Sequence, residues 1–254
     1  MKALCARSAP MALAGVLLLA GMAASADSPE RRVILFFGDS ITAGYGVGRE
    51  QAFPAWVQAR LDSLGWDFEV VNAGLAGETA AAGLRRVDWI LRRPVDVFVL
   101  ELGGNDGLRG LPLGGTQAAL QQILERVRAR HPDAVLVVAG MQLPPNLGPQ
   151  YGEEFRRLFP RLAARTGAVL VPFLLDGVGG VPGLMQVDGI HPTAEGHRRI
   201  ALVVWKHLEP VLRRLSAGSL GAAHGLQGRS RLDAPAAGGA DQDGEGGDGQ
   251  EGQP

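Results

Sequence analysis

Residues 33–44 read Val-Ile-Leu-Phe-Phe-Gly-Asp-Ser-Ile-Thr-Ala-Gly. The run from Val33 to Phe37 is apolar at every position and consists of aliphatic and aromatic residues, a pattern typical of a strand that is buried on both faces. Such strands occur in parallel sheets whose two faces are covered by helices. A Gly-Asp-Ser triplet ends the run, so the Ser40 hydroxyl is expected just beyond the carboxyl end of this strand.

Similar apolar runs alternate with amphipathic segments along the rest of the chain. Four further runs predict strands: Phe68 to Val71, Val95 to Leu100, Ala134 to Ala139 and Ala168 to Val171. Five segments space their apolar residues three or four positions apart and predict helices: Ala52 to Leu64, Thr79 to Arg93, Thr116 to Arg130, Glu153 to Thr166 and Thr193 to Leu215. This alternation predicts a three-layer α/β/α fold with about five parallel strands and helices on both faces.

The two ends of the chain differ in composition from the part between them. Residues 1–26 carry two basic residues, then an apolar run, then Ala24-Ser25-Ala26, which together predict a cleaved secretory signal peptide. The apolar run is too short and too rich in glycine to be a membrane anchor. Residues 216–254 are rich in Gly, Ala, Asp and Gln and predict a disordered acidic tail. A single folded domain is therefore expected over residues 27–215, exported to the periplasm or the extracellular space.

The composition excludes several function classes. The net charge of −1 and the aromatic content of 6% argue against a nucleic-acid partner. The one cysteine, Cys5, lies in the predicted signal peptide, so the mature chain has no thiol for a nucleophile, a metal site or a disulfide. Five scattered histidines without an H-E-x-x-H motif do not predict a metal site, and no dinucleotide or phosphate-loop motif is present. We expect no metal, no cofactor and no membrane span after signal cleavage.

Residues that could take part in catalysis follow several of the predicted strands. They are Ser40, Gly77 and Asn105, with Asp188 and His191 beyond the fifth strand. Each has an ordinary structural role as an alternative: Ser40 as a helix cap, Gly77 and Asn105 as turn residues, and the acid and histidine as a surface pair. Because ligands bind outside the carboxyl ends of parallel strands, their gathering at one edge favours a hydrolytic site over five separate structural roles.

These residues resemble the conserved blocks of a known enzyme family. Gly-Asp-Ser at 38–40, Gly77, Gly-Gly-Asn-Asp at 103–106 and Asp188-x-x-His191 are similar to the four blocks of the SGNH (GDSL) hydrolases, and the resemblance spans roughly Val33 to Leu212. Residues 101–110 and 188–192 resemble one branch in particular, the secreted multifunctional acyl-CoA thioesterases, lysophospholipases and arylesterases. The resemblance implies a flavodoxin-like fold and a serine esterase that acts on carboxylic esters and thioesters.

The resemblance also implies a role for each residue. Ser40 would be the nucleophile, His191 the general base, and Asp188 the acid that orients the imidazole. The backbone N–H groups of Ser40 and Gly77 and the side-chain amide of Asn105 would form the oxyanion hole. Two neighbouring acids, at positions 39 and 106, are interpreted as hydrogen-bond acceptors that brace loops.

An apolar loop after the fourth predicted strand suggests the substrate class. Residues 141–151 contain three prolines and two leucines and resemble the substrate-facing loop of the family. We expect Leu143 and Pro144 from this loop, with Leu108 and Met185, to contact the acyl chain of a small acyl ester or a lysophospholipid, and Leu111 to lie nearby. The alternatives are a carbohydrate O-acetyl esterase of the same fold, with a short polar pocket, and a noncatalytic binding module.

The remaining histidines and aromatic residues are assigned structural roles. His131, His197 and His207 are predicted to lie on the surface. The four tryptophans are predicted to be packing residues, and Tyr45 either lines the cleft or covers the first helix.

Overall fold

A computed structural model describes residues 31–227 of the chain. The predicted signal peptide, residues 1–26, and most of the predicted tail lie outside the described residues. The centre of the fold is a five-stranded parallel sheet with the order β2-β1-β3-β4-β5. Its strands are β1 (Arg32–Gly38), β2 (Phe68–Asn72), β3 (Val97–Glu101), β4 (Val135–Ala139) and β5 (Val169–Val171). The predicted parallel sheet is confirmed.

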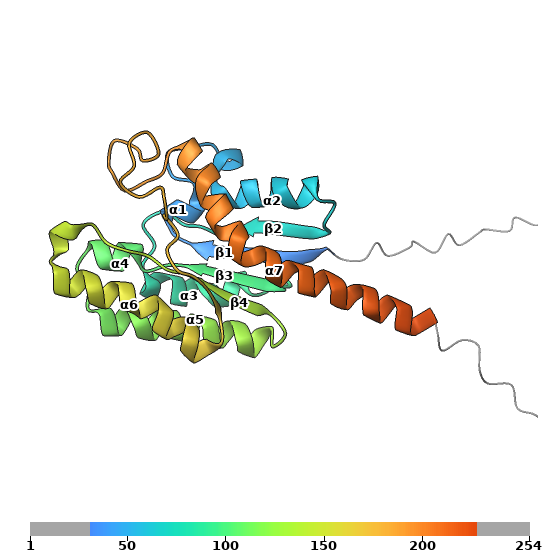
Figure 1. Cartoon of the computed structure of the whole chain (residues 1–254). Coiled ribbons are helices and arrows are strands. Elements are labelled where there is room, and N and C mark those ends of the chain that lie inside the picture. The colour runs from blue at the N-terminus through green and yellow to red at the C-terminus, as the bar shows by residue number, and fades with distance from the viewer. Residues whose placement is uncertain (1–30, 228–254) are drawn as a thin grey trace, which may run out of the picture. The chain divides into compact units, whose positions relative to one another are not determined.

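Helices cover both faces of this sheet, as Figure 1 shows. The long helices are α2 (Phe53–Ser63), α3 (Ala80–Ile90), α5 (Leu113–Arg130), α6 (Pro149–Thr166) and α7 (Ala194–Gln227). α3, α5 and α6 pack on one face, and α2 and α7 pack on the other. Four short helical segments, absent from the sequence-based prediction, lie in the loops: α1 (Ser40–Ala43), η1 (Arg49–Gln51), α4 (Gly104–Leu108) and η2 (Pro145–Leu147).

The apolar run from Val33 to Phe37 is continuous because β1 is buried on both faces of the sheet. Ile34 and Phe36 pack against α2 and α7, whereas Leu35 and Phe37 pack against the helices of the opposite face. All four side chains are completely buried. Each buried side chain of this size contributes about 1.5–3 kcal/mol relative to an exposed one, so a polar residue at any of these positions would weaken the sheet.

The strand order brings the candidate residues to one edge. From β1 the chain goes to β2 on one side and then crosses back to β3 on the other, so the chain changes direction between β1 and β3. The crevice outside the carboxyl ends of the strands at such a point is the usual ligand site of an open α/β sheet. α1 follows β1 and α4 follows β3, and Figure 1 shows both short helices at the same end of the sheet.

Two sequence-based predictions about α7 are wrong. The helix continues past the predicted end at Leu215 to Gln227, because propagation of an existing helix through an Ala-rich segment without proline needs no new nucleation. His197 is completely buried rather than exposed, because it lies on the same helical face as Ile200 and Val204. Burial lowers the pKa of His197 to about 4.

The tryptophans divide between the core and the surface. Trp205 is buried and its ring lies 5.7 Å from that of Trp66, as expected of packing residues. Trp89 is 65% exposed, so its prediction as a packing residue is wrong. Within residues 31–227, none of the helices has the length and apolar character that crossing a bilayer requires.

Candidate active site

The structure brings the three predicted triad residues into one hydrogen-bonded chain. Ser40 is the first residue of α1, and its Oγ lies 3.0 Å from His191 Nε2. His191 Nδ1 lies 2.7 Å from Asp188 Oδ2. Because a carboxylate accepts hydrogen bonds, Nδ1–H donates to Asp188, which leaves the Nε2 lone pair facing the Ser40 hydroxyl. This is the arrangement in which an imidazole takes a proton from serine.

Asp188 is held in place by its own loop. Its Oδ1 accepts hydrogen bonds from the backbone N–H groups of Ile190, at 2.9 Å, and His191, at 3.0 Å. The side-chain hydrogen bond from His191, followed by these backbone bonds, lowers the pKa of Asp188 to about 2. The carboxylate is therefore ionised at neutral pH and favours the charged imidazolium that forms when His191 accepts a proton.

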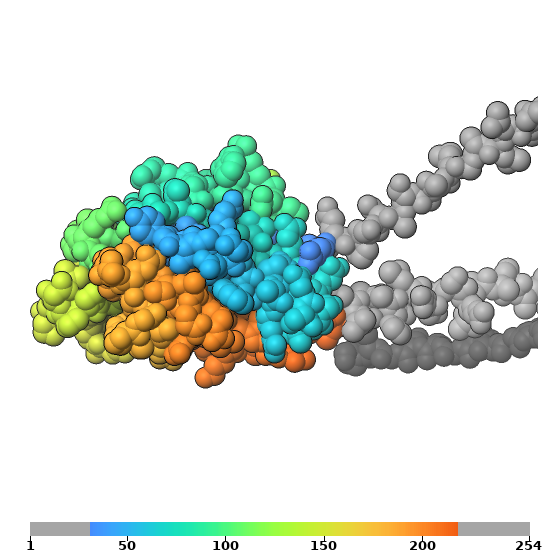
Figure 2. Space-filling model, turned by 90° about the horizontal axis from the view of Figure 1, so that it is seen from above, coloured from blue at the N-terminus to red at the C-terminus, as the bar shows by residue number. Residues whose placement is uncertain are grey.

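The loop that carries the acid and the base is attached to the loop that follows the nucleophile. Gln186 Nε2 donates to the backbone oxygen of Tyr45 at 2.8 Å, and the ring of Tyr45 lies 4.6 Å from the His191 ring. In Figure 2 the segments near these two parts of the chain, blue and orange, lie side by side. Tyr45 is 53% exposed, so it borders the site rather than covering α1.

The turn that presents Ser40 is capped by its neighbour. Asp39 Oδ1 accepts a hydrogen bond from Ile41 N at 3.0 Å, which makes Asp39 the N-cap of α1. The alternative role of Ser40 as the helix cap is therefore wrong. Asp39 is buried, and this burial raises the pKa of its carboxyl to about 6.

Two backbone N–H groups at the site are free to bind an oxyanion. Within the described residues, the N–H groups of Ser40 and Gly77 make no hydrogen bond. Gly77 has a φ of +77°, which glycine adopts without strain. The Gly77 loop is fixed by Arg86, which pairs with the buried carboxylate of Glu78 and donates to the Ala73 oxygen at 2.9 Å.

Asn105 is the third predicted donor, and its amide has a defined orientation. Nδ2 lies 3.1 Å from Asp39 Oδ2 and 3.2 Å from the Glu78 backbone oxygen, and Oδ1 accepts a long 3.5 Å bond from Arg109. The amide nitrogen therefore lies between the nucleophile turn and the Gly77 loop. The other predicted brace, Asp106, accepts from Ala80 N at 2.8 Å and thereby supports the first turn of α3.

One buried carboxyl at the site has no assignment from the sequence. Glu101, the last residue of β3, is completely buried, and its Oε2 lies 2.6 Å from Thr42 Oγ1. Burial, followed by the neighbouring Asp39, raises the pKa of Glu101 well above its usual range. The sequence contained a signal for this group, because an acid that ends an otherwise apolar strand needs hydrogen-bond donors nearby.

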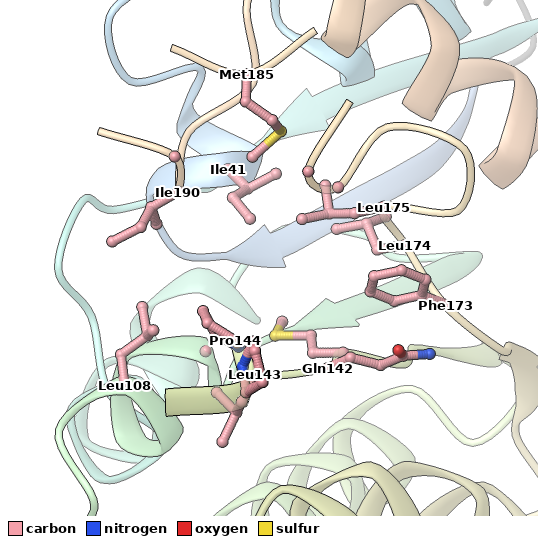
Figure 3. Close-up of a pocket in the computed structure, with 16 residues that line it drawn as sticks. Ile41, Leu108, Gln142, Leu143, Pro144, Phe173, Leu174, Leu175, Met185 and Ile190 are labelled. Atoms are coloured by element: carbon pink, nitrogen blue, oxygen red, sulfur yellow. The ribbon is translucent and has the colours of Figure 1, made fainter. Parts of the chain in front are cut away.

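Figure 3 shows an apolar pocket of about 380 Å³. It lies beside the triad residues, because Ile41 and Ile190, the chain neighbours of Ser40 and His191, line it. The predicted substrate residues Leu108, Leu143 and Pro144 form one wall, and Met185 lies opposite with Ile41 and Ile190. Three residues after β5 close one end: Phe173, Leu174 and Leu175. Leu111 does not line the pocket.

The residues after β5 were missed by sequence reasoning. The run Phe173-Leu174-Leu175 begins one residue, Pro172, after a strand that is only three residues long. Its position beyond the carboxyl end of β5 was the available signal. Among the described residues, no group of three or more His, Cys, Asp or Glu side chains is arranged to hold a metal ion.

Comparison with known proteins gives the same family that the motifs indicate. The family model described as "GDSL-like Lipase/Acylhydrolase family" matches residues 36–199. The chain belongs to this family. It is 44% identical to the esterase TesA of Pseudomonas aeruginosa over 183 residues, which are 71% of this chain and 90% of the relative. It is 37% identical to "Thioesterase 1/protease 1/lysophospholipase L1" of Escherichia coli over 198 residues, 78% of this chain and 90% of the relative.

Solved structures of GDSL-family enzymes share the fold. The crystal structure of TesA covers 70% of this chain and 99% of its own, with a TM-score of 0.68 and 43% identity. The psychrotrophic esterase EstA from Pseudoalteromonas was solved with monoethylphosphonate as an inhibitor. Its structure matches with a TM-score of 0.68 and 31% identity, and the match covers 72% of this chain and 99% of EstA. The chain is thus an ester-hydrolysing enzyme of the GDSL family with a flavodoxin-like α/β/α fold, and the alternative of a noncatalytic binding module is wrong.

Proposed function

We propose that this GDSL-family enzyme hydrolyses esters and thioesters of apolar acids through an acyl-enzyme on Ser40. The observation that carries the proposal is the continuous chain from Asp188 through His191 to Ser40, at 2.7 and 3.0 Å, beside a pocket with apolar walls. No other described serine has a histidine and an acid aligned behind it in this way.

The geometry supports a two-step reaction. His191 Nε2 takes the Ser40 proton as Oγ attacks the carbonyl carbon, and the free N–H groups of Ser40 and Gly77 stabilise the resulting oxyanion. The Asn105 amide joins them when one of its two N–H groups, which donate to Asp39 and to the Glu78 oxygen, turns to the oxyanion. Collapse of this intermediate breaks the bond to the leaving group, which receives the proton from His191. A water molecule then repeats the sequence on the acyl-enzyme, which releases the acid and restores the Ser40 hydroxyl.

The pocket indicates the substrate class. Ile41, Gly104 and Ile190 line it, and these residues are the chain neighbours of Ser40, Asn105 and His191. An acyl group attached at the Ser40 oxygen therefore has direct access to apolar walls. Relatives named thioesterase and lysophospholipase, and an arylesterase of Vibrio mimicus at 34% identity, support acyl esters, acyl thioesters and lysophospholipids as substrates.

A carbohydrate O-acetyl esterase remains the second candidate for the substrate class. A two-carbon acyl group would leave most of the 380 Å³ pocket unused, so the pocket favours longer acyl groups. We also propose that residues 1–26 direct export, which would place the enzyme in the periplasm or outside the cell.

The mechanism is tested by labelling with a fluorescent alkyl phosphonate, followed by mass spectrometry of the labelled peptide. We expect the label on Ser40 and hydrolysis of p-nitrophenyl octanoate, p-nitrophenyl acetate and octanoyl-CoA. Ser40→Ala should lose both the label and turnover, whereas Ser63→Ala, which changes an exposed serine of α2, should keep both. Labelling elsewhere, or turnover by the Ser40 variant, would overturn the mechanism.

A further inference from the structure

The buried carboxyl of Glu101 gathers donors from both sides of the nucleophile. Its Oε2 accepts hydrogen bonds from Asp39 N at 3.2 Å, from Thr42 N at 3.2 Å and from Thr42 Oγ1 at 2.6 Å. Asp39 and Thr42 lie on either side of the Ser40-Ile41 pair. Glu101, the last residue of β3, therefore holds the first turn of α1 at both ends.

The bonds around Ser40 leave one donor unused. Glu101 takes the N–H groups of residues 39 and 42, and the Asp39 carboxyl takes the N–H of Ile41. Only the Ser40 N–H remains without a partner within the described residues. The arrangement therefore reserves the backbone donor of the nucleophile and fixes the direction in which it points.

The same network reaches a second oxyanion donor. Asp39 Oδ2 accepts a bond from Asn105 Nδ2 at 3.1 Å, and Asp39 N is held by Glu101 at 3.2 Å. Movement of the Glu101 carboxyl would therefore shift the Ser40 turn and the Asn105 amide together. Gly38 of β1 leaves the space that the carboxyl occupies, because a Cβ at this position would lie 2.4 Å from Glu101 Oε2.

We propose that Glu101 is a positioning residue of the oxyanion hole, which sets the Ser40 N–H and the Asn105 amide through Asp39 and Thr42 without touching the substrate. This role rests on the proposed function of Ser40 and Asn105. It assigns a purpose to a buried acid whose Oε1 has no hydrogen-bond partner among the described residues.

The hydrogen bonds of Glu101 make the proposal testable with an amide. All three bonds at Oε2 need an acceptor oxygen, and burial raises the pKa of the carboxyl well above its usual range, which favours the neutral form. Glutamine supplies that oxygen in the same volume, whereas leucine fills the volume and supplies none. Glu101→Leu leaves Thr42 N and Thr42 Oγ1 without their acceptor, so these two buried donors would have to move. Asp39 N would keep only its 3.2 Å bond to the backbone oxygen of residue 101.

The experiment compares Glu101→Gln with Glu101→Leu on p-nitrophenyl hexanoate. Complete removal of one oxyanion donor lowers the rate by about 10²–10³. Glu101→Leu removes no donor but shifts two of them, so we expect a smaller loss of kcat, roughly 10- to 100-fold. KM should change less than about threefold, because the pocket walls are untouched, and Glu101→Gln should keep kcat within about fivefold of the parent. An equal loss in both variants, or a loss confined to KM, would overturn the proposal.

A matched pair of inhibitors separates positioning from general damage. A trifluoromethyl ketone forms a tetrahedral adduct with serine that needs the oxyanion hole, whereas the methyl ketone of equal length binds through the pocket alone. Glu101→Leu should weaken the trifluoromethyl ketone by about the same factor as kcat and leave the methyl ketone nearly unchanged. Equal weakening of both ketones would indicate a structural role only and would overturn the proposal.

Thr42→Val is the second variant, for the case in which Glu101→Leu does not fold. It removes the 2.6 Å bond to Glu101 without changing the size of the side chain, and Thr116→Val is its control, since Thr116 Oγ1 donates to another buried acid, Asp106, at 3.1 Å. We expect Thr42→Val to lower kcat by about 3- to 10-fold and Thr116→Val to lower it by less than twofold. Equal kcat values would overturn the proposal, whereas an active Ser40→Ala enzyme would instead overturn the proposed function.

Discussion

Substitution of Leu143 by asparagine should reduce the preference for longer acyl chains. Leu143 is half-buried in one wall of the pocket, in the loop that precedes α6. Asparagine has a similar size but presents a polar amide to the pocket. Because the proposed triad and oxyanion donors lie outside this loop, turnover of acetate esters should stay within about twofold of the parent value.

The size of the effect follows from the methylene groups that the pocket receives. Going from acetyl to hexanoyl adds four methylenes, each worth up to about 0.8 kcal/mol when fully buried. The pocket is partly open to solvent, so we expect half of that gain, about 1.6 kcal/mol, which corresponds to roughly 15-fold in kcat/KM. Loss of one apolar wall in Leu143→Asn should reduce the ratio of kcat/KM for the hexanoyl ester to that for the acetyl ester by roughly three- to fivefold.

The assay is kcat/KM for p-nitrophenyl esters from acetate to octanoate, measured on the parent, Leu143→Asn and Leu111→Asn. Leu111 is the matched control, because it is a partly exposed leucine of a neighbouring loop that does not line the pocket. If both variants change the chain-length ratio equally, the effect does not come from the pocket. If acetate is the best substrate and Leu143→Asn has no chain-dependent effect, the acyl pocket is refuted and the carbohydrate deacetylase becomes the better hypothesis.

Four further predictions test the triad, the buried acid and export. Ser40→Ala should abolish turnover and change the free energy of unfolding by less than about 1 kcal/mol in urea titrations, because Asp39 caps α1. His191→Ala should reduce kcat as much as Ser40→Ala, and Asp188→Ala by less; an unimpaired His191 variant would assign the base elsewhere. The raised pKa of Asp39, about 6 against 3.8, means that the folded protein binds this proton more tightly than the unfolded chain does. The parent should therefore lose up to about 3 kcal/mol of stability relative to Asp39→Asn as pH rises from 4 to 7, and equal pH dependence of unfolding would refute this. N-terminal sequencing of the exported protein should begin at Asp27, and an intact signal segment would refute cleavage.

The fold was predictable because both faces of the sheet are covered. Each strand then has apolar residues at consecutive positions, as in the run from Val33 to Phe37, and each helix shows one apolar face. Helix starts were less predictable than helix interiors. α5 begins at Leu113 rather than Thr116 because the Gly114-Gly115 pair, which weakens a helix in isolation, is accepted in its first turn.

The candidate site was predictable where its residues adjoin strand ends, and unpredictable where they meet only through packing. Ser40 and Asn105 follow β1 and β3 directly, so the topology alone brings them together. The Phe173 end of the pocket and the Glu101 carboxyl depend on how loops and side chains fill the space beyond the sheet. No local pattern of residues encodes those contacts, because they join positions about 60 or more apart in the chain.

The two halves of the triad illustrate the difference between local and long-range encoding. Asp188 and His191 are three positions apart, and their hydrogen bonds are made within one loop, so this half is encoded locally. The bond from His191 to Ser40 spans 151 positions and depends on where that loop lies. Gln186 fixes the position by donating to Tyr45 O, and it lies so close to Gly46 that a Cβ there would be 2.3 Å from the Gln186 Oε1 atom. Gly46 also has a φ of +79°, so a side chain at this position would strain the backbone as well as displace the Gln186 amide that holds the loop of His191 near Ser40.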